Sequence, residues 1–582
     1  MAIISKLSNE IISEVFHYYI AAYASDPFHR GWSYKWTKLR LVCGAWNEIL
    51  KAAVFWNKIP VTSLRAMKLV IERGMRSGFE MRGSLTSVAD EAEQQKFALM
   101  LGLAGEIRIM DLSISEDMIR ASDAPTPKLN HLVLRKGSTP PVRPVQHPKT
   151  LLTRFRSPAV SKLQLQGFTW TEIKPLLGAF VEDLTLEQIS DIPILQFGTV
   201  LEGMKKLRRL SASDAHLVVL HGTYLSKLER LKLFGLEQQT VSGNSLLNAV
   251  GNMQQLERLD IQIRVAGISN DAPVITLPSL TSLSVVLSRS RDVAYLGRVI
   301  APRIRHFQLS CLNVMQEDDD ELEKALRTVR PLIRQLMRNI HLHTARIFSL
   351  SSQDLHLTLI EHPTSHVRPE EGIHFELCIE DQGRMINYMS RYLHSLWPQI
   401  TALYVRDGHY SGKDALAAWH KLFRTMKRVE SVHLERKGVK VMPEGLHHYA
   451  RNGIADVVFP VLRILYLESV CFRPQRRKNQ GNWEIKAKPR KGSFLEDLKR
   501  SFRLSDAASE NNLPNAHDGA LDVDEAVVEL EDGTRRTQWT KPKDDGKFRL
   551  VINNAVRLYK TDVEKLNKPG RMVIWDSVNR RK

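Results

Sequence analysis

The sequence predicts an α/β protein with a short helical module at its start, an irregular solenoid of repeated strand–helix units, and a charged, partly disordered tail. Three observations predict this architecture. Apolar residues recur at helical spacing within the first 60 residues. A short apolar phrase then recurs through the middle of the chain every 21 to 31 residues. The last hundred or so residues carry separate blocks of basic and acidic residues.

The composition is that of a folded chain without a membrane span. Of 582 residues, 43% are hydrophobic and 25% are charged, which is typical of globular proteins. No run approaches the ~20 apolar residues that a membrane-spanning helix needs, so no membrane partner is expected. The first residues meet an acid at Glu10 and lack a small-residue cleavage site, which favours an amphipathic helix over a signal peptide.

The four cysteines are far apart and form no C-x-x-C pair, so neither a disulfide framework nor a structural zinc cluster is expected. Cysteine usage of this kind favours a reducing compartment, the cytoplasm or the nucleus. The net charge of +19 allows attraction to nucleic acid, anionic membranes or acidic proteins, and it carries no information on the fold.

The first 60 residues predict a small helical unit. Ile11, Ile12, Val15 and Phe16 share one face of a first helix, with Ser8 as its N-cap. Residues 24–35 contain a proline and a glycine that break the pattern. A second helical period then runs from residue 36 to residue 50, and it places Cys43 on a buried face.

These residues resemble an F-box. The family pattern is a Leu-Pro-x-Glu-Ile start, a Val-Cys-x-x-Trp centre and a terminal Leu-Trp. The matching blocks stand in order at residues 7–16, 39–49 and 55–59, with Ser8 where the family has proline. The resemblance covers about a tenth of the chain. It implies a three-helix module that docks a Skp-type adaptor and, through that adaptor, a cullin.

The resemblance also implies which residues contact the adaptor. Carried over by position, these residues are Leu7, Ser8, Ile11, Ile12, Val15, Phe16, Val42 and Trp46. The alternative is that they form only the core of a helical cap on the domain that follows.

The middle of the chain is a repeat of the phrase L-x-x-L-x-L, in which any aliphatic residue is allowed. Its central positions have a mean spacing of 25 residues and stand at 132, 163, 184, 210, 231, 259, 283 and 307. Its last two apolar positions are two residues apart and therefore point to the same side of a strand. Each strand is too short to bury its own apolar face, so neighbouring units must stack.

This array resembles leucine-rich repeats of an irregular kind, because the usual Asn or Cys after the strand is absent. The phrase returns around residues 403, 432 and 465. The expected divisions are an F-box-like module at 1–60, a helical linker or cap at 61–125, the repeat solenoid at 126–470 and a largely flexible tail at 471–582. Fusions of an F-box to leucine-rich repeats resemble substrate receptors of cullin–RING ubiquitin ligases.

The predicted register places four cations on the open face of the array. Arg209, Arg230 and Arg258 precede the central leucine in successive repeats, and Lys232 lies beside them. A column of guanidinium groups matches carboxylates or phosphates, so these residues are candidate substrate-binding residues. The alternative is a solvated face whose arginines pair with Glu229 and Glu257.

The tail carries eleven Lys/Arg and three Asp/Glu between residues 473 and 503, a local net charge of +8. This run predicts a nuclear-import signal, a nucleic-acid patch or a solvated linker. The acidic segment that follows, 505–533, is expected to be disordered. Two later apolar pieces, 548–552 and 572–575, are candidate strands or docking segments.

No sequence motif indicates an active site. The P-loop, the dinucleotide-binding glycine pattern, the H-E-x-x-H zinc motif and the nucleophile elbow are all missing. We therefore expect no enzymatic activity, no catalytic residue, no cofactor and no metal. The first hypothesis is a ligase substrate receptor that binds a protein substrate. The alternatives are a non-ligase repeat scaffold and a nuclear nucleic-acid-associated protein that uses the basic run.

Overall fold

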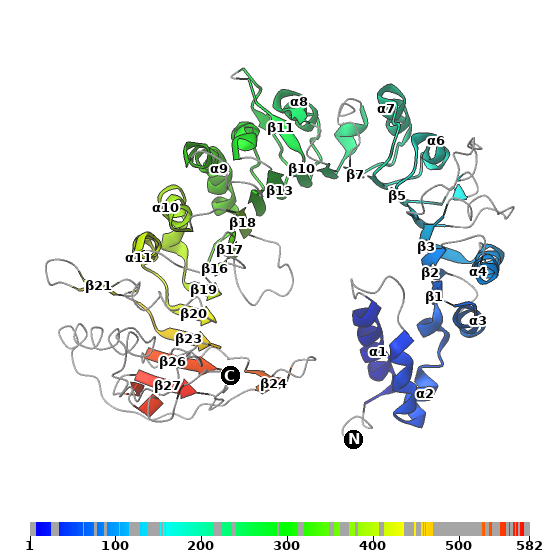
Figure 1. Ribbon diagram of the computed structural model, residues 1–582, viewed down its shortest axis with the longest axis horizontal. Coiled ribbons are helices and arrows are strands. Elements are labelled where there is room, and N and C mark those ends of the chain that lie inside the picture. The colour runs from blue at the N-terminus through cyan, green and yellow to red at the C-terminus, as the bar shows by residue number, and fades with distance from the viewer. Residues whose placement is uncertain are drawn as a thin grey trace, which may run out of the picture. The chain divides into compact units, whose positions relative to one another are not determined.

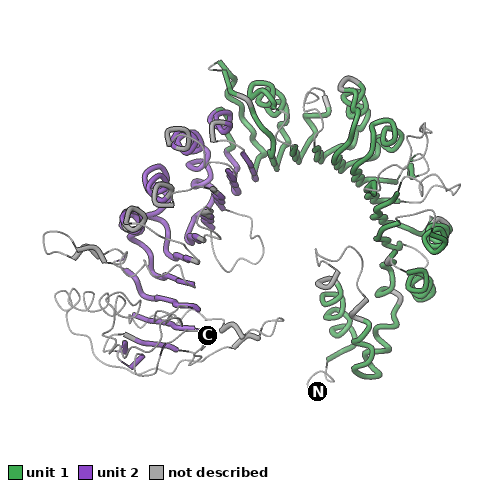
Figure 2. Tube along the Cα trace, viewed as in Figure 1, with its two compact units in different colours: residues 1–280, 298–301 green, residues 281–297, 302–582 purple. Residues whose placement is uncertain are grey.

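The fold of the chain is taken from a computed structural model (Figure 1). The structure describes residues 7–24, 34–61, 63–74, 78–85, 90–103, 105–115, 129–137, 152, 155–157, 159–213, 223–235, 240–269, 271–287, 290–311, 319–348, 354–360, 372–378, 382–406, 413–435, 447–449, 455–457, 459, 461–469, 527–529, 535–537, 548–553, 558, 563–564, 566–567 and 571–575. The chain divides into two compact units (Figure 2). Unit 1 comprises residues 1–280 and 298–301, and unit 2 comprises residues 281–297 and 302–582.

The strands of unit 1 form a long parallel sheet in which each strand pairs with the next one along the chain. They are β1 (Lys58–Val61), β2 (Phe79–Leu85), β3 (Ile107–Ile114), β4 (His131–Lys136), β5 (Lys162–Gln166), β6 (Asp183–Glu187), β7 (Arg209–Ser213), β8 (Arg230–Phe234) and β10 (Arg258–Gln262). Two short parallel pairs stand apart from this sheet: β9 (Thr240–Ser242) with β11 (Arg264–Ala266), and β12 (Ile275–Thr276) with β14 (Val299–Ile300).

The central apolar positions of the phrase lie in register across this sheet. Each is at most 5% exposed, and in unit 1 they are Leu132, Leu163, Leu184, Leu210, Leu231 and Leu259. The side chains on either side of each central residue are more exposed along β5, β6 and β8. Alternating burial follows from the period of two in a strand that is packed on one face.

Helices cover one side of this sheet. α3 (Leu64–Arg73), α4 (Glu91–Gly102), α6 (Trp170–Ile173), α7 (Ile194–Gly203) and α8 (Gly243–Gly251) all lie on the same side of the strands (Figure 1). Short 3₁₀ turns, η5 (Lys174–Leu176) and η7 (Thr223–Lys227), join them there. The side chain of Ser63 caps α3 by accepting a hydrogen bond from the Ala66 amide at 3.1 Å. The opposite face of the strands carries mostly polar and charged side chains from β5 to β10.

The segment 61–125, expected to be a helical linker or cap, contains strands as well as the helices α3 and α4. It contains β2 and β3, which pair with β1 and β4 and so extend the sheet. Met81 and Met110 stand at the central position, in register with Leu132. The aliphatic phrase does not admit methionine, and the register shifts between Phe79 and Glu80. The repeat pattern is therefore too irregular in this segment to predict strands from the sequence.

The first 60 residues form a helical module within unit 1. It consists of α1 (Asn9–Ala24), η2 (Tyr34–Leu41), α2 (Gly44–Ile49) and η3 (Ala53–Trp56), and it leads directly into β1. The second predicted helix, residues 36–50, is interrupted at Val42 and Cys43, since a 3₁₀ turn ends before them and α2 begins after them. Cys43 is the extended N-cap residue of α2 and is exposed, so its predicted burial is wrong.

Unit 2 also contains a long, mostly parallel sheet. Its strands, in spatial order, are β13 (Ser282–Leu287), β15 (His306–Cys311), β18 (Gly372–Cys378), β17 (Asp354–Ile360), β16 (Thr344–Phe348), β19 (Ala402–Arg406), β20 (Ser431–Glu435), β23 (Ile464–Glu468), β26 (Phe548–Asn553) and β27 (Arg571–Trp575). β17 is antiparallel to both of its neighbours. The chain thus folds back once, through β16, β17 and β18, inside an otherwise parallel sheet.

The phrase positions predicted in the second half of the chain also lie in register. Leu403, Val432 and Leu465 pair across β19, β20 and β23. The sheet then continues through β26 and β27, where Leu550 and Val573 take the same position. Two antiparallel pairs are separate from the sheet: β21 (His447–Tyr449) with β22 (Ala455–Val457), and β24 (Val527–Glu529) with β25 (Arg535–Thr537).

The helices of unit 2 are α9 (Asp319–Asn339), α10 (Gln382–Tyr392) and α11 (Lys413–Thr425), with the 3₁₀ turns η8 (Ser290–Arg298) and η10 (Trp397–Gln399). α9 runs past Pro331, where the sequence predicts an end or a kink. Leu332 and Ile333 are almost completely buried after this proline. Their packing offsets the hydrogen bond that a helical proline removes.

The tail is only partly described. The basic run 473–503 lies outside the described residues, and so does the acidic segment except for 527–529. The two apolar pieces near the end are strands β26 and β27 of the unit 2 sheet. The region 471–582 therefore contributes to the folded core, which differs from the expected flexible tail.

Candidate binding surfaces

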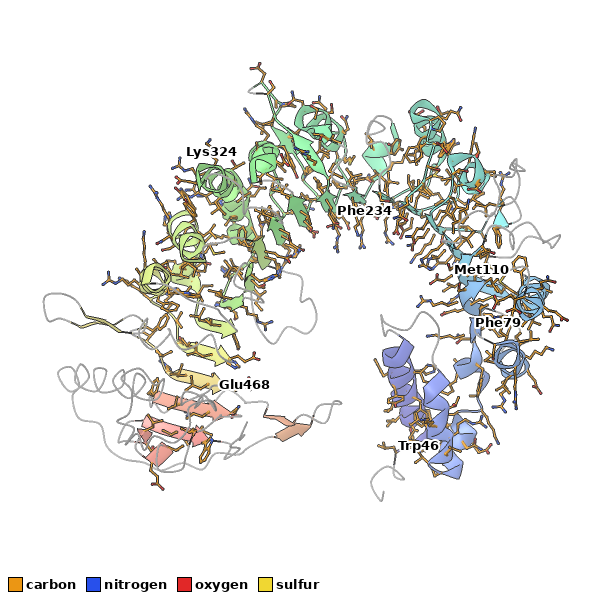
Figure 3. The ribbon with its side chains drawn as sticks, in the orientation of Figure 1. Trp46, Phe79, Met110, Phe234, Lys324 and Glu468 are labelled. Atoms are coloured by element: carbon orange, nitrogen blue, oxygen red, sulfur yellow. The ribbon has the colours of Figure 1, made fainter. Side chains whose placement is uncertain are left out.

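The N-terminal module has a small aromatic core. Phe16 is 2% exposed, and its ring centroid lies 5.0 Å from that of Trp46 (labelled in Figure 3) and 6.5 Å from that of Phe55. The indole Nε1 of Trp56 donates a hydrogen bond of 2.9 Å to the carbonyl oxygen of Leu50. These contacts fix α1 against α2 and the turn before β1, because edge-to-face aromatic pairs add to the energy of apolar burial.

Six of the eight predicted adaptor-contact residues have exposed or half-exposed side chains. Leu7, Ile11, Val15 and Val42 are 40–54% exposed. Ser8 is exposed as well, and Trp46 is half-buried by its contact with Phe16.

Ile12 and Phe16 differ from the other six, since they are only 7% and 2% exposed. They belong to the core of the module, so the structure places them inside it and not among the exposed residues of the predicted contact set. A helical face with spacing i, i+1, i+4, i+5 is wide, and only part of it turns inward. Which part does so depends on the partner helix, which the pattern of one helix does not specify.

The exposed apolar residues of α1 form a stripe. Leu7, Ile11 and Val15 follow one another at intervals of four residues, and Tyr18, which is 73% exposed, continues the same side of the helix. We call Leu7, Ile11, Val15 and Tyr18 the α1 stripe. Aliphatic side chains repeated on one helix face commonly mark a surface that another protein covers.

Ser8 organises the start of this helix. Its carbonyl oxygen accepts the Ile12 amide at 3.1 Å, and its hydroxyl lies 3.5 Å from the Ile11 amide. The Ser8 side chain also hydrogen-bonds to the carboxylate of Glu10, which lowers the pKa of that exposed carboxyl. A serine at this position therefore gives α1 a defined start.

The four predicted cations of unit 1 stand together on the open face of the sheet. Arg209 pairs in register with Arg230, and Arg230 pairs with Arg258, across the adjacent strands β7, β8 and β10. Lys232 follows Arg230 on the same face of β8 and contacts Phe234, the residue labelled there in Figure 3. We call Arg209, Arg230, Lys232 and Arg258 the basic row.

Two members of the basic row pair with carboxylates. Arg209 Nη1 lies 3.5 Å from Asp183 Oδ2, and Arg258 Nε lies 3.0 Å from Asp260 Oδ2. Glu229, one of the partners considered above, pairs instead with Arg208, whose pKa it raises. This ion pair assigns Glu229 to Arg208, and Glu257 keeps its place in the alternative, since it too has an interaction within the chain.

The centre of the basic row has a different environment. Within the described part of the chain, neither Arg230 nor Lys232 forms an ion pair with a carboxylate, and both are exposed. The ammonium group of Lys232 lies 4.9 Å from the centroid of the Phe234 ring, a cation–π contact that leaves the charge accessible.

A second group of side chains on an open strand face occurs in unit 2, and the sequence did not indicate it as a site. Tyr404, His433 and Tyr466 stand in register on β19, β20 and β23. Their ring centroids are 5.2 and 5.7 Å apart along the row, and Arg346 lies 5.5 Å from the Tyr404 ring. His433 Nε2 lies 3.0 Å from Glu468 Oε2, and burial raises the pKa of Tyr404 and Tyr466.

The signal for this row was present in the sequence. All three residues follow the central position of the phrase at Leu403, Val432 and Leu465, so the repeat register alone places them in one row. The rings contact one another at tilted angles across neighbouring strands, as cross-strand aromatic pairs do when they stabilise a sheet. Their mutual contacts account for the arrangement without a ligand.

No group of three or more His, Cys, Asp or Glu side chains in the described residues is arranged to hold a metal ion. Among the described helices, none combines the length and apolar character needed to cross a membrane.

Comparison with known proteins adds little to this description. No protein-family model and no curated protein matches the chain. Among solved structures, the chain is similar to a protein from Bacteroides fragilis at 11% identity and a TM-score of 0.21. The match covers 44% of this chain and 60% of that one, and at this level it supports no conclusion about fold or function.

Proposed function

We propose that the chain is a substrate-recognition subunit of a cullin–RING ubiquitin ligase. In this proposal the N-terminal module docks a Skp-type adaptor, and the strand–helix array is a leucine-rich-repeat-like solenoid that holds a protein substrate. The chain itself carries out no chemistry. It raises the effective concentration of its substrate near the subunits that transfer ubiquitin. Such a receptor would act in the cytoplasm or the nucleus.

The observation that carries the proposal is the division of α1 into two sides. One side closes the module through Phe16, and the other presents the α1 stripe to solvent. If the module were only a cap for the array, the repeated aliphatic side chains on its outer side would stay in contact with water. The stripe, together with the ordered F-box-like blocks of the sequence, supports adaptor docking.

The direct test is capture of a purified Skp-type adaptor by the full chain. The informative variant is Ile11→Asp with Val15→Asp, since both side chains are exposed and the change should leave the module folded. The matched control is Asn9→Asp with Ser13→Asp, which adds the same two charges to α1 outside the stripe. Circular dichroism and thermal unfolding check that all three proteins remain folded.

We expect the wild type and the control to capture the adaptor and the stripe variant to lose it. Equal capture by the stripe variant and the control would contradict the assigned surface. Failure of all three folded proteins to bind would remove the ligase proposal, and the non-ligase scaffold would then be favoured. Nucleic-acid association through the basic run remains a separate hypothesis, whose binding should weaken steeply with salt.

A further inference from the structure

We propose that the basic row of unit 1 binds an acidic segment of a partner protein, one that presents several separate carboxylates. This inference deepens the proposed function, because it gives the substrate a chemical class. It rests on the charges of the strand face and does not depend on the adaptor. The site consists of Arg230 and Lys232 at the centre and Arg209 and Arg258 at its edges.

Several charges elsewhere on the same face pair within the chain. On β2, β3 and β4, Asp111 is 7% exposed and lies between two arginines. Its Oδ2 is 2.9 Å from Arg82 Nε, and its Oδ1 pairs with Arg135. Arg108 pairs with Glu80 at 3.1 Å. Each of these arginines thus has a carboxylate partner within the chain, although Asp111 serves two of them, whereas Arg230 and Lys232 at the centre of the basic row have none among the described residues.

The basic row is electrostatically unfavourable when nothing is bound to it. Neighbouring strands in a sheet are ~4.8 Å apart, so Arg230 stands close to a like charge on each side. Like charges directly opposite one another destabilise strand pairing. Asp183 and Asp260 pair with the outer two arginines, which leaves Arg230 and Lys232 without a carboxylate partner among the described residues. An anionic partner would relieve this repulsion.

The arrangement favours several carboxylates over one phosphate. The four cations stand on three different strands, and side chains on a sheet project alongside one another instead of converging on a point. The outer two guanidinium groups already bind carboxylates, each through a single contact. A glutamate- or aspartate-rich segment laid across β7, β8 and β10 would continue that pattern over Arg230 and Lys232.

Nucleic acid fits the row less well. Binding of single strands usually combines basic side chains with aromatic rings on which bases stack. Phe234 is the aromatic residue beside the row, and Lys232 lies over its ring. The neighbouring face positions on β7 and β10 carry Ser211 and Asp260, neither of which offers a ring on which a base could stack.

The test measures peptide binding to the full chain without adaptor. The probes are a fluorescent glutamate-rich peptide, the same peptide with glutamine at those positions, a version of the glutamine peptide with one phosphoserine, and a single-stranded oligonucleotide. The site variant is Arg230→Gln with Lys232→Gln. The control is Lys205→Gln with Lys227→Gln, which removes two exposed cations outside the strand face.

We expect the glutamate-rich peptide to bind best, with an affinity that falls about tenfold in the site variant and little in the control. Tighter binding of the phosphoserine peptide or the oligonucleotide would overturn the assignment to carboxylates. Equal losses of affinity in the site variant and the control would rule out the basic row as the binding site. So would the absence of peptide binding to the folded wild type. The site variant should still capture the adaptor, so failure here is distinguishable from failure of the proposed function.

Discussion

Truncation of Phe16 should open the N-terminal module, whereas truncation of its neighbour Val15 should not. Phe16 is 2% exposed and packs against two aromatic rings, while Val15 is 54% exposed. Removal of a buried phenylalanine side chain costs about 3–5 kcal/mol, and a change on the surface usually costs less than about 0.5 kcal/mol. The two variants, Phe16→Ala and Val15→Ala, therefore separate the inner side of α1 from its outer side.

Native-state amide hydrogen exchange is the appropriate assay, because it reports the local opening of α1 within the intact chain. A loss of 3 kcal/mol accelerates exchange through local opening by roughly 150-fold, since each 1.4 kcal/mol is tenfold. We expect that acceleration in Phe16→Ala and less than about threefold in Val15→Ala. Similar exchange of α1 in both variants would refute the assignment of inner and outer sides.

Three further predictions concern the rest of the chain. Gly372→Ala should lower the melting temperature of unit 2, because Gly372 has φ +148° and an added Cβ would collide with the Leu359 carbonyl oxygen. Asp111→Asn should destabilise unit 1 by about 1–2 kcal/mol in urea unfolding, since it leaves two arginines without their carboxylate. Tyr392→Phe should raise the pKa of Glu323 toward its ordinary value in an NMR titration, because the tyrosine hydroxyl donates to that carboxylate.

Each of these predictions has an outcome that would contradict it. An unchanged melting temperature in Gly372→Ala would mean that the β17–β18 pairing tolerates a side chain at the start of β18. If Asp111→Asn had the same free energy of unfolding in urea as the wild type, the ion pairs of Asp111 would contribute no measurable stability. The lowered pKa of Glu323 implies stability present above the ordinary glutamate pKa and lost as the pH falls through the lowered value. This loss of stability at low pH should be smaller in Tyr392→Phe than in the wild type.

The sequence predicted the repeated strands well where the apolar phrase is regular. The register of Leu132 through Leu259 was accessible because the phrase has fixed internal spacing and the strands are parallel. The in-register placement of Arg230 followed from the same spacing. The mixed α/β class follows from these strands and the helices between them.

Other elements could not be predicted because non-local packing decides them. Met81 and Met110 occupy the central position in β2 and β3, and methionine carries no strong preference for strands. β17 is inserted between β16 and β18, and only their pairing establishes that order. β26 follows β23 after a long intervening segment, so its place beside Leu465 was not accessible from a repeat period.

The candidate surfaces could also be predicted only in part, because contacts between distant residues decide which side chains are exposed. The pattern of α1 identified the amphipathic residues, but the position of Trp46 decides that Phe16 is inside and Ile11 is outside. The register of β8 identified Arg230 and Lys232 as face residues. Which cations are neutralised depends on pairs formed between strands, as with Arg209 and Asp183.

The measurement that tests the central proposal most directly is an amide-exchange footprint of the full chain with and without a purified Skp-type adaptor. Adaptor docking predicts slower exchange in α1 and in the turn at Val42 that precedes α2, with the strands of unit 2 unaffected. An adaptor that leaves α1 unprotected, or that protects only unit 2, would contradict the assignment of the α1 stripe as the docking surface.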